Sequence, residues 1–135
     1  MYKHYVQYYE TDKMGVTHHS NYIRFMEEAR VQFFKDIGFD YAELEKTGVY
    51  SPVVAINNCR YRQPTRFDDT ILIDVTIKQY TGVRIVLHYS MYNGDKLVFE
   101  GESEHCFVTS EGKIVKVGEN NYPEFHQKLK SLVSE

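Results

Sequence analysis

A carboxylate and an imidazole lie in a short glycine-containing segment that directly precedes a long amphipathic stretch. The segment runs from Tyr8 to Tyr22 and contains Asp12, Gly15 and His19. A helix start presents backbone N–H groups without intrahelical partners, together with the positive end of the helix dipole. Those N–H groups can hold an oxyanion while a nearby carboxylate attacks a carbonyl carbon or activates water. The segment is therefore a candidate site for nucleophilic or general-base chemistry.

Each of these residues also has a plainer interpretation, and the sequence leaves both open. Asp12 is either the nucleophile or general base, or an acceptor in an Asx turn of the loop. His19 either orients water, bonds the substrate oxygen or positions Asp12, or it is only a polar residue near a helix start. Tyr22 either lines a substrate pocket or belongs to the core, for which its helical spacing is typical. Gly15 is expected to let the loop turn tightly.

The composition restricts the class of protein. The chain has 135 residues, 42% of them hydrophobic and 26% charged, which predicts one ordinary globular domain over residues 1–135. A net charge of −3 argues against a broad nucleic-acid surface. No stretch approaches the ~20 apolar residues of a membrane helix, and the start lacks the apolar core of a signal peptide. Cys59 and Cys106 are expected to be buried thiols in a reducing cytoplasm.

Metal and cofactor chemistry finds little support in the pattern. His18 and His19 are adjacent and project differently, and no His-x-x-x-His pair or cysteine cluster accompanies them. His88 and His105 lie in strand-like stretches, where a histidine is more often a hydrogen-bonded sheet residue than a ligand. We therefore expect neither a metal ion nor a cofactor.

Two helices are predicted after the candidate segment. From Asn21 to Ile37, apolar residues recur at three- and four-residue steps, which predicts a long helix with one wide apolar face. Ser20 or Asn21 is expected to cap its start, and Gly38 suits its end. A capping-box pattern then indicates a short helix from Asp40 to about Gly48.

The rest of the chain is typical of strands. Tyr2 to Tyr9 is expected to form the first of them, and after position 50 the apolar period changes to two. Gly101 within the last of these stretches indicates a bulge or a close backbone approach. The further predicted elements are strands at Pro52 to Tyr61, Ile71 to Lys78, Val83 to Met91 and Leu97 to Thr109, with hairpin turns at Tyr80-Thr81-Gly82 and Asn93-Gly94-Asp95 and a terminal helix from Asn121 onward.

Helices and strands that come in separate runs predict an α+β fold with an antiparallel sheet. One long helix lying against a curved five-stranded sheet is the natural assembly. Because that helix covers only one face of the sheet, the far face and the edges need another cover. We therefore expect copies of the chain to associate.

Two sequence motifs carry a resemblance to a known family. Asp12, Gly15 and Asn21-Tyr22, with His19 between them, form the first and more specific motif. Tyr61, Pro64 and Asp68-Asp69 form the second. In both, the chain resembles the 4-hydroxybenzoyl-CoA thioesterase type of hotdog-fold enzyme, and it is similar to the bacterial Tol-Pal-associated thioesterases. The resemblance extends over nearly the whole chain.

The resemblance implies an acyl-CoA thioesterase whose long central helix packs on a curved five-stranded antiparallel sheet. It implies that Asp12 is the nucleophile or general base, that the backbone N–H of His19 helps to hold the oxyanion, and that the His19 side chain assists. Gly15, Asn21 and Tyr22 are candidate substrate-binding residues. The family also implies a homodimer, often paired into a homotetramer, whose sites lie at the subunit boundary.

The sequence departs from the family in ways that keep other functions open. Lys13 stands where Pro or Ala is frequent, and Thr81-Gly82-Val83, with only Arg84 nearby, stands where the prototype enzyme has a basic cluster for a CoA phosphate. A non-catalytic acyl-CoA-binding protein is therefore one alternative, and an acyl carrier protein could replace CoA. An acyl-thioester hydro-lyase is a weaker alternative, because Met14 lies fourteen residues before Glu28, where the hydro-lyase pattern has histidine.

Overall fold

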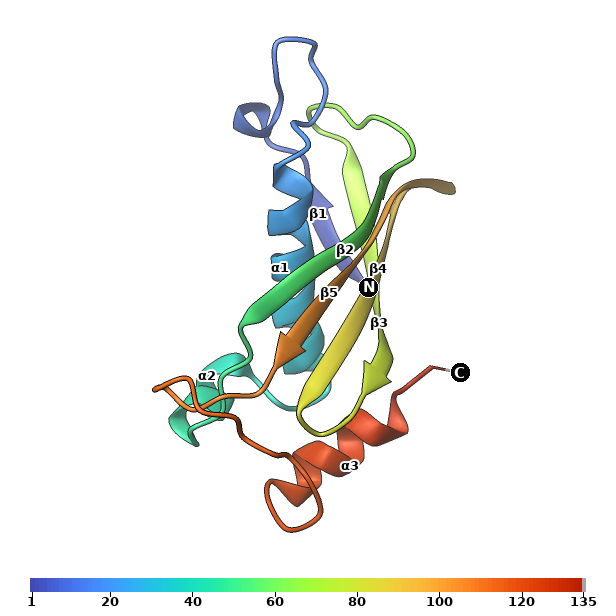
Figure 1. Ribbon diagram of the computed structural model, residues 1–135. Helices are drawn as coiled ribbons and strands as arrows, with labels where there is room; N and C mark the ends of the chain where they lie inside the picture. Colours follow the sequence, from blue (N-terminus) through green and yellow to red (C-terminus); the bar gives the residue numbers. More distant parts are fainter. Residues whose placement is uncertain (135) are drawn as a thin grey trace.

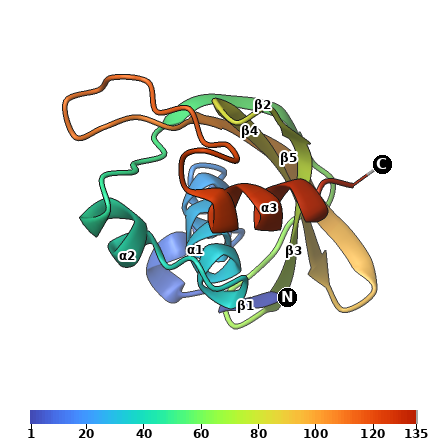
Figure 2. The same cartoon turned by 90° about the horizontal axis from the view of Figure 1, so that it is seen from below.

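A curved antiparallel sheet and one long helix make up most of the protein. The computed structural model describes residues 1–134. The strand order is β1-β3-β4-β5-β2, with β1 and β2 at the two edges. All four neighbouring pairs are antiparallel, so the α+β prediction is confirmed. The sheet curves around one side of α1, which is the arrangement expected for a hotdog fold (Figures 1 and 2). The elements are β1 Tyr2–Tyr5, a 3₁₀ helix Tyr8–Glu10, α1 Asn21–Asp36, α2 Tyr41–Lys46, β2 Val53–Tyr61, β3 Thr70–Tyr80, β4 Arg84–Asn93, β5 Lys96–Cys106 and α3 Pro123–Ser131.

The apolar face of α1 forms the centre of the core. Phe25, Met26 and Ala29 are completely or almost completely buried, and they pack with Ile73 and Leu87 of the sheet in one hydrophobic cluster. Their three- and four-residue spacing places them on one side of the helix. The predicted long helix is thus confirmed, with its end at Asp36 and Gly38 in a left-handed conformation just beyond it (φ +92°).

The first strand is shorter than predicted. It ends at Tyr5, and residues Tyr8–Glu10 turn into a 3₁₀ helix. The Glu10 carboxylate accepts hydrogen bonds from the backbone N–H of Gln7 (2.7 Å) and from His4 Nε2 (2.8 Å). These bonds fold the chain back on itself, although its aromatic and β-branched residues suit a strand.

The predicted caps are only partly confirmed. Neither Ser20 nor Asn21 provides a side-chain cap for α1, because Ser20 is itself helical in conformation and Asn21 donates to the backbone oxygen of Glu10 (2.8 Å). At α2, by contrast, the Asp40 carboxylate accepts from the N–H of Ala42 (2.9 Å). A local pattern predicts the cap only where no distant partner competes for the side chain.

Gly101 of β5 is a place of close approach, not a bulge. It pairs regularly with Tyr89 of β4, but a Cβ atom there would lie 3.0 Å from the Phe99 ring and 3.2 Å from Cys59 Sγ. The irregularity lies in the neighbouring strand, where the register of β2 shifts between Asn57 and Arg60. β5 also ends at Cys106, before the predicted Thr109.

Helix α3 closes the lower end of the molecule. Phe125 and Leu129 are buried in the same core as the apolar face of α1. Cys59 and Cys106 are free and only half-buried, so the expected full burial of both thiols is wrong. No helix within residues 1–134 is long and apolar enough to span a membrane.

Candidate functional site

A hollow of about 360 Å³ lies at the N-terminal end of α1. It unites three of the predicted site residues, Asp12, His19 and Tyr22. The opposite wall comes from the end of β2 and the loop that follows it, which had not been assigned to the site from sequence. The lining residues are Asp12, Val16, Thr17, His19, Tyr22, Tyr61, Arg62, Gln63 and Pro64.

Asp12 is held in place by the turn that it begins. Its Oδ1 atom accepts from the backbone N–H of Met14 (2.8 Å) and, at longer range, from that of Val16 (3.4 Å). Its own N–H donates to the Val16 carbonyl (2.9 Å). Oδ2 has no hydrogen-bond partner among residues 1–134. The side chain is thus an Asx-turn acceptor through one oxygen and presents the other without a protein partner, so the two interpretations of Asp12 are compatible.

Of the backbone N–H groups just before α1, one differs from its neighbours in its hydrogen bonding. The N–H groups of His18 and Asn21 donate to the carbonyls of Glu10 (2.8 Å) and His18 (3.0 Å). Ser20 N–H donates to His18 Nδ1 (3.2 Å), and Tyr22 N–H donates to the His19 carbonyl (3.3 Å). Within the described chain, no acceptor pairs with the N–H of His19. A donor of this kind at a helix start is suited to bind a negatively charged oxygen.

The two adjacent histidines have different surroundings. His18 Nδ1 lies 2.8 Å from the hydroxyl oxygen of Ser20, which fixes that ring outside the lining of the hollow. The His19 ring lines the hollow and stands edge-on to Tyr61, with the ring centroids 6.4 Å apart. The two rings nevertheless lie side by side, with their centroids 4.3 Å apart, so the expectation that they project differently is wrong.

Tyr22 is buried and tied to the wall of the hollow by a chain of hydroxyl groups. Its hydroxyl oxygen lies 2.8 Å from Thr65 Oγ1, which in turn lies 2.6 Å from Thr17 Oγ1. Burial raises the pKa of Tyr22, while the hydrogen bonds from the two threonines act in the opposite direction. Tyr22 therefore presents a rigid, uncharged aromatic surface.

Tyr61 joins the end of strand β2 to the segment just before α1. Its hydroxyl group donates to the His19 carbonyl (3.2 Å), and its ring packs edge-on against Tyr22. Burial, with smaller contributions from Cys59 and Tyr22, raises the pKa of Tyr61, so the phenol stays protonated as a donor at neutral pH. The second sequence motif contains Tyr61, but nothing in its local spacing indicates a contact with His19.

The two other candidate binding residues lie outside the lining of the hollow. Gly15 turns the loop with a positive φ of 79°, and its N–H donates to the Asp12 carbonyl (3.0 Å). Asn21 is buried and engaged with Glu10. Both contribute to the shape of the segment that carries Asp12 and His19.

Charged groups near the hollow are mostly paired. Arg62 lines it and donates from Nη2 to Glu100 (2.7 Å). Arg84, the only cation where the family has a basic cluster, is paired with Glu104 (2.8 Å). Within residues 1–134 no group of three or more His, Cys, Asp or Glu side chains is placed to hold a metal ion.

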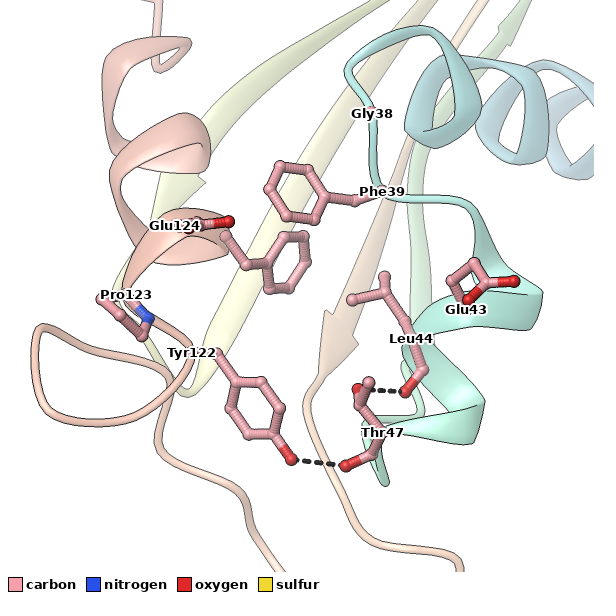
Figure 3. A pocket seen from close by; sticks show the side chains of 9 residues that line it. Gly38, Phe39, Glu43, Leu44, Thr47, Tyr122, Pro123 and Glu124 are labelled. Carbon is pink, nitrogen blue, oxygen red and sulfur yellow. Dashed lines mark hydrogen bonds between the residues drawn. The ribbon is translucent and has the colours of Figure 1, made fainter.

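A second hollow, of about 300 Å³, lies between the α2 and α3 segments (Figure 3). Both helices lie at the end of α1 opposite its N-terminus (Figure 1). Its wall is largely apolar, with Phe39 and Leu44 facing Tyr122 across it. The Tyr122 hydroxyl donates to the Thr47 carbonyl (2.7 Å), which ties the two helical segments together. No residue of the Asp12–Tyr22 segment reaches this hollow.

Several known proteins that this chain resembles are named as thioesterases. Residues 6–131 match the family described as the thioesterase-like superfamily. The Bacillus subtilis protein named "Putative acyl-CoA thioesterase YneP" is 37% identical over 122 residues, which cover 90% of this chain and 88% of the relative. An Aquifex aeolicus protein named "Putative esterase" is 35% identical over 118 residues, 87% of this chain and 90% of its own.

A solved structure extends the likeness to three dimensions. The DHNA-CoA thioesterase from Staphylococcus aureus superimposes with a TM-score of 0.89 at 28% identity, over 96% of this chain and 87% of that one. The match to the family covers nearly the whole chain and includes the segment that carries Asp12 and His19. The chain therefore belongs to the thioesterase-like superfamily and is a thioester hydrolase.

Proposed function

We propose that the protein hydrolyses an acyl-CoA thioester to a free acid and CoA, with Asp12 as the general base or nucleophile. One observation carries the proposal: a single hollow gathers the Asp12 carboxylate and His19, whose backbone N–H has no acceptor within residues 1–134. Negative charge that develops on a carbonyl oxygen needs such a preorganised donor, and the attack needs a base within reach.

The reaction follows from these two groups. Asp12 Oδ2 takes a proton from a water molecule, whose oxygen attacks the thioester carbonyl carbon. The carbonyl π electrons move to the oxygen, which the His19 N–H stabilises as an oxyanion. The oxyanion then re-forms the carbonyl, the C–S bond breaks, and CoA leaves as a thiolate that takes up a proton. If Asp12 attacks directly instead, an anhydride forms first and water hydrolyses it.

The walls of the hollow suggest how the acyl part is held. Tyr22 and Tyr61 contribute aromatic surface, and Val16 and Pro64 add apolar surface beside them. The CoA thioester as substrate is inferred from the named relatives, among them the Bacillus protein and the staphylococcal enzyme. In this proposal the His19 side chain orients the water or the thioester oxygen from the rim.

A thiol-release assay across aromatic, short-chain and long-chain acyl-CoA substrates tests the proposed activity. We expect at least one of them to release CoA thiol in proportion to the enzyme present. If the protein shows ligand-dependent melting shifts but no thiol release with any substrate, the non-catalytic binding function replaces the proposal. An enoyl thioester that gains water without losing CoA would instead indicate a hydro-lyase.

We also propose that the active form is a homodimer or a homotetramer. Strand β2 is an edge of the sheet, and Val53 and Val54 on it are exposed. Tyr61 ends the same strand and lines the hollow, so a second copy paired along β2 would lie beside the site. Light scattering during gel filtration tests this. A monomer at micromolar concentration that retains full turnover would exclude it.

A cytoplasmic location fits the state of the cysteines. Cys59 and Cys106 are both free thiols, as is usual for a reducing compartment. We propose this location for the protein. Cell fractionation tests it, and recovery in an extracellular fraction would contradict it.

A further inference from the structure

His4 forms a buried connection between two carboxylates that lie on either side of it. Its Nε2 atom is 2.8 Å from Glu10 Oε1, and its Nδ1 atom is 3.1 Å from Glu28 Oε1. The side chains of His4 and Glu10 are only 10% and 5% exposed. Each ring nitrogen of His4 thus has a glutamate oxygen as its hydrogen-bond partner. We call His4, Glu10 and Glu28 the His4 clamp.

Glu10 connects the clamp to both halves of the proposed site. Besides accepting from His4 and Gln7 through its carboxylate, it accepts through its backbone carbonyl from the N–H of His18 and from Asn21 Nδ2, both at 2.8 Å. Glu10 therefore holds the residues on either side of His19. It also lies two residues before Asp12, so its position influences where that carboxylate stands.

The other half of the clamp lies on helix α1. Asn21, Phe25 and Glu28 are spaced by four and three residues and so share one face of the first two turns. The His4 ring packs on Phe25 with the ring centroids 4.0 Å apart, and Glu28 also accepts from the Tyr2 hydroxyl (2.6 Å). These contacts connect β1, the 3₁₀ helix and α1 next to the segment that carries Asp12.

We propose that His4 is a positioning residue for thioester hydrolysis: the His4 clamp sets the placement of the Asp12 carboxylate relative to the His19 N–H. His4 does not line the hollow, so it acts through Glu10 and not on the substrate. The inference rests on the proposed function, because it assigns a consequence to the separation of those two groups. Displacements of about 1 Å at a reacting centre can cost ~100-fold in rate.

Replacing His4 by Phe tests the proposal, since phenylalanine keeps a ring on Phe25 but donates no hydrogen bond. We expect His4→Phe to lower kcat by about 10- to 100-fold per folded molecule while KM changes by less than about threefold. In an Asp12→Asn background the same change is expected to alter the residual rate by less than about twofold, because the geometry that it maintains no longer serves a base. A purely structural role would lower the folded fraction and leave the kcat of folded molecules unchanged.

His88 offers a matched control. It also lies between two carboxylates, with Nε2 4.0 Å from Glu100 Oε1 and Nδ1 3.6 Å from Glu102 Oε2, but it is on strand β4 and is not one of the residues that line the hollow. His88→Phe is expected to leave kcat unchanged. If His4→Phe fails to fold, Glu28→Leu removes the oxygen that faces His4 Nδ1 and leaves the bond between Gln7 and Glu10 in place, with a kcat loss in the same direction expected.

The outcomes separate this inference from the proposed function. If Asp12→Asn abolishes turnover while folded His4→Phe and Glu28→Leu keep wild-type kcat, positioning by the clamp is wrong and the role of Asp12 stands. If the Asp12→Asn enzyme itself keeps full turnover, the proposed role of Asp12 is wrong, and the positioning inference is overturned with it.

Discussion

The hydroxyl group of Tyr61 donates a hydrogen bond of 3.2 Å to the backbone carbonyl of His19. This bond joins the end of strand β2 to the segment just before α1, across 42 positions of sequence. Tyr61 and His19 both line the hollow that contains Asp12. The bond between them therefore stabilises a part of the wall that the Asx turn of Asp12 does not form. The site thus depends on a contact between elements that are distant in the chain.

Removing this bond should affect activity more than stability. Tyr61 is 52% exposed, so the loss of its hydroxyl group in Tyr61→Phe should cost at most about 1 kcal/mol of unfolding free energy. We expect kcat to fall by about three- to tenfold, because the His19 backbone loses one support. Steady-state kinetics and urea unfolding measure the two effects. Tyr5→Phe is the matched control, since Tyr5 is 53% exposed and its hydroxyl group bonds to nothing in the described chain; an equal activity loss there would contradict the interpretation.

The buried hydroxyl chain behind Tyr22 should contribute to stability. Thr65→Val removes the group that lies 2.8 Å from the Tyr22 hydroxyl and 2.6 Å from Thr17 Oγ1, and leaves both without that partner. A buried group left without its partner costs about 1–3 kcal/mol, which is the expected loss of unfolding free energy. Denaturant unfolding measures it. The double variant Thr65→Val/Tyr22→Phe should lose less than the sum of the single changes, and strict additivity would count against the chain.

His105 should make the stability of the protein depend on pH. Burial, together with the charge of Arg30, lowers the pKa of His105 from 6.5 to about 4. The unfolded chain therefore binds a proton at this histidine between about pH 6.5 and 4 while the folded chain does not, so folding stability falls as the pH falls through that window. The contribution is complete above about pH 6.5, and its loss amounts to at most about 3 kcal/mol.

Comparison of wild type with His105→Gln isolates this contribution. The variant has no group that titrates at position 105, so it should lose less unfolding free energy than wild type between pH 7.5 and pH 4.5. Urea unfolding at the two pH values gives both differences. Parallel losses in the two proteins would show that other groups account for the acid sensitivity.

Much of this architecture could be predicted from local patterns. The apolar period over Asn21–Asp36 and the alternation over Thr70–Tyr80 depend on neighbours in sequence, and both predicted elements are present. Patterns failed where a side chain found a distant or unexpected partner. The bonds of Glu10 stabilise a 3₁₀ helix where the end of the first strand was predicted. The Asn21 side chain donates to the Glu10 carbonyl instead of capping its own helix.

In the candidate site, too, the residues that are close in sequence could be predicted and the distant ones could not. Asp12 and His19 could be selected from sequence because they lie in one loop before a helix, and they do share a hollow. Tyr61 and the residues after it could not be assigned to the site, because only the pairing of β2 with β5 and the path of the following loop bring them there. Residue spacing therefore indicates the chemistry of the site but not the wall that completes it.

The central claim is that the Asp12 carboxylate performs the hydrolysis. The most direct measurement is thiol release by Asp12→Asn on the best acyl-CoA substrate of the wild-type enzyme, with Asp95→Asn in the exposed β4–β5 turn as the matched control. The account predicts that Asp12→Asn folds normally and loses about 1,000-fold or more in kcat, as expected when an essential base or nucleophile is removed, while Asp95→Asn keeps the wild-type rate. Full turnover by folded Asp12→Asn would contradict it.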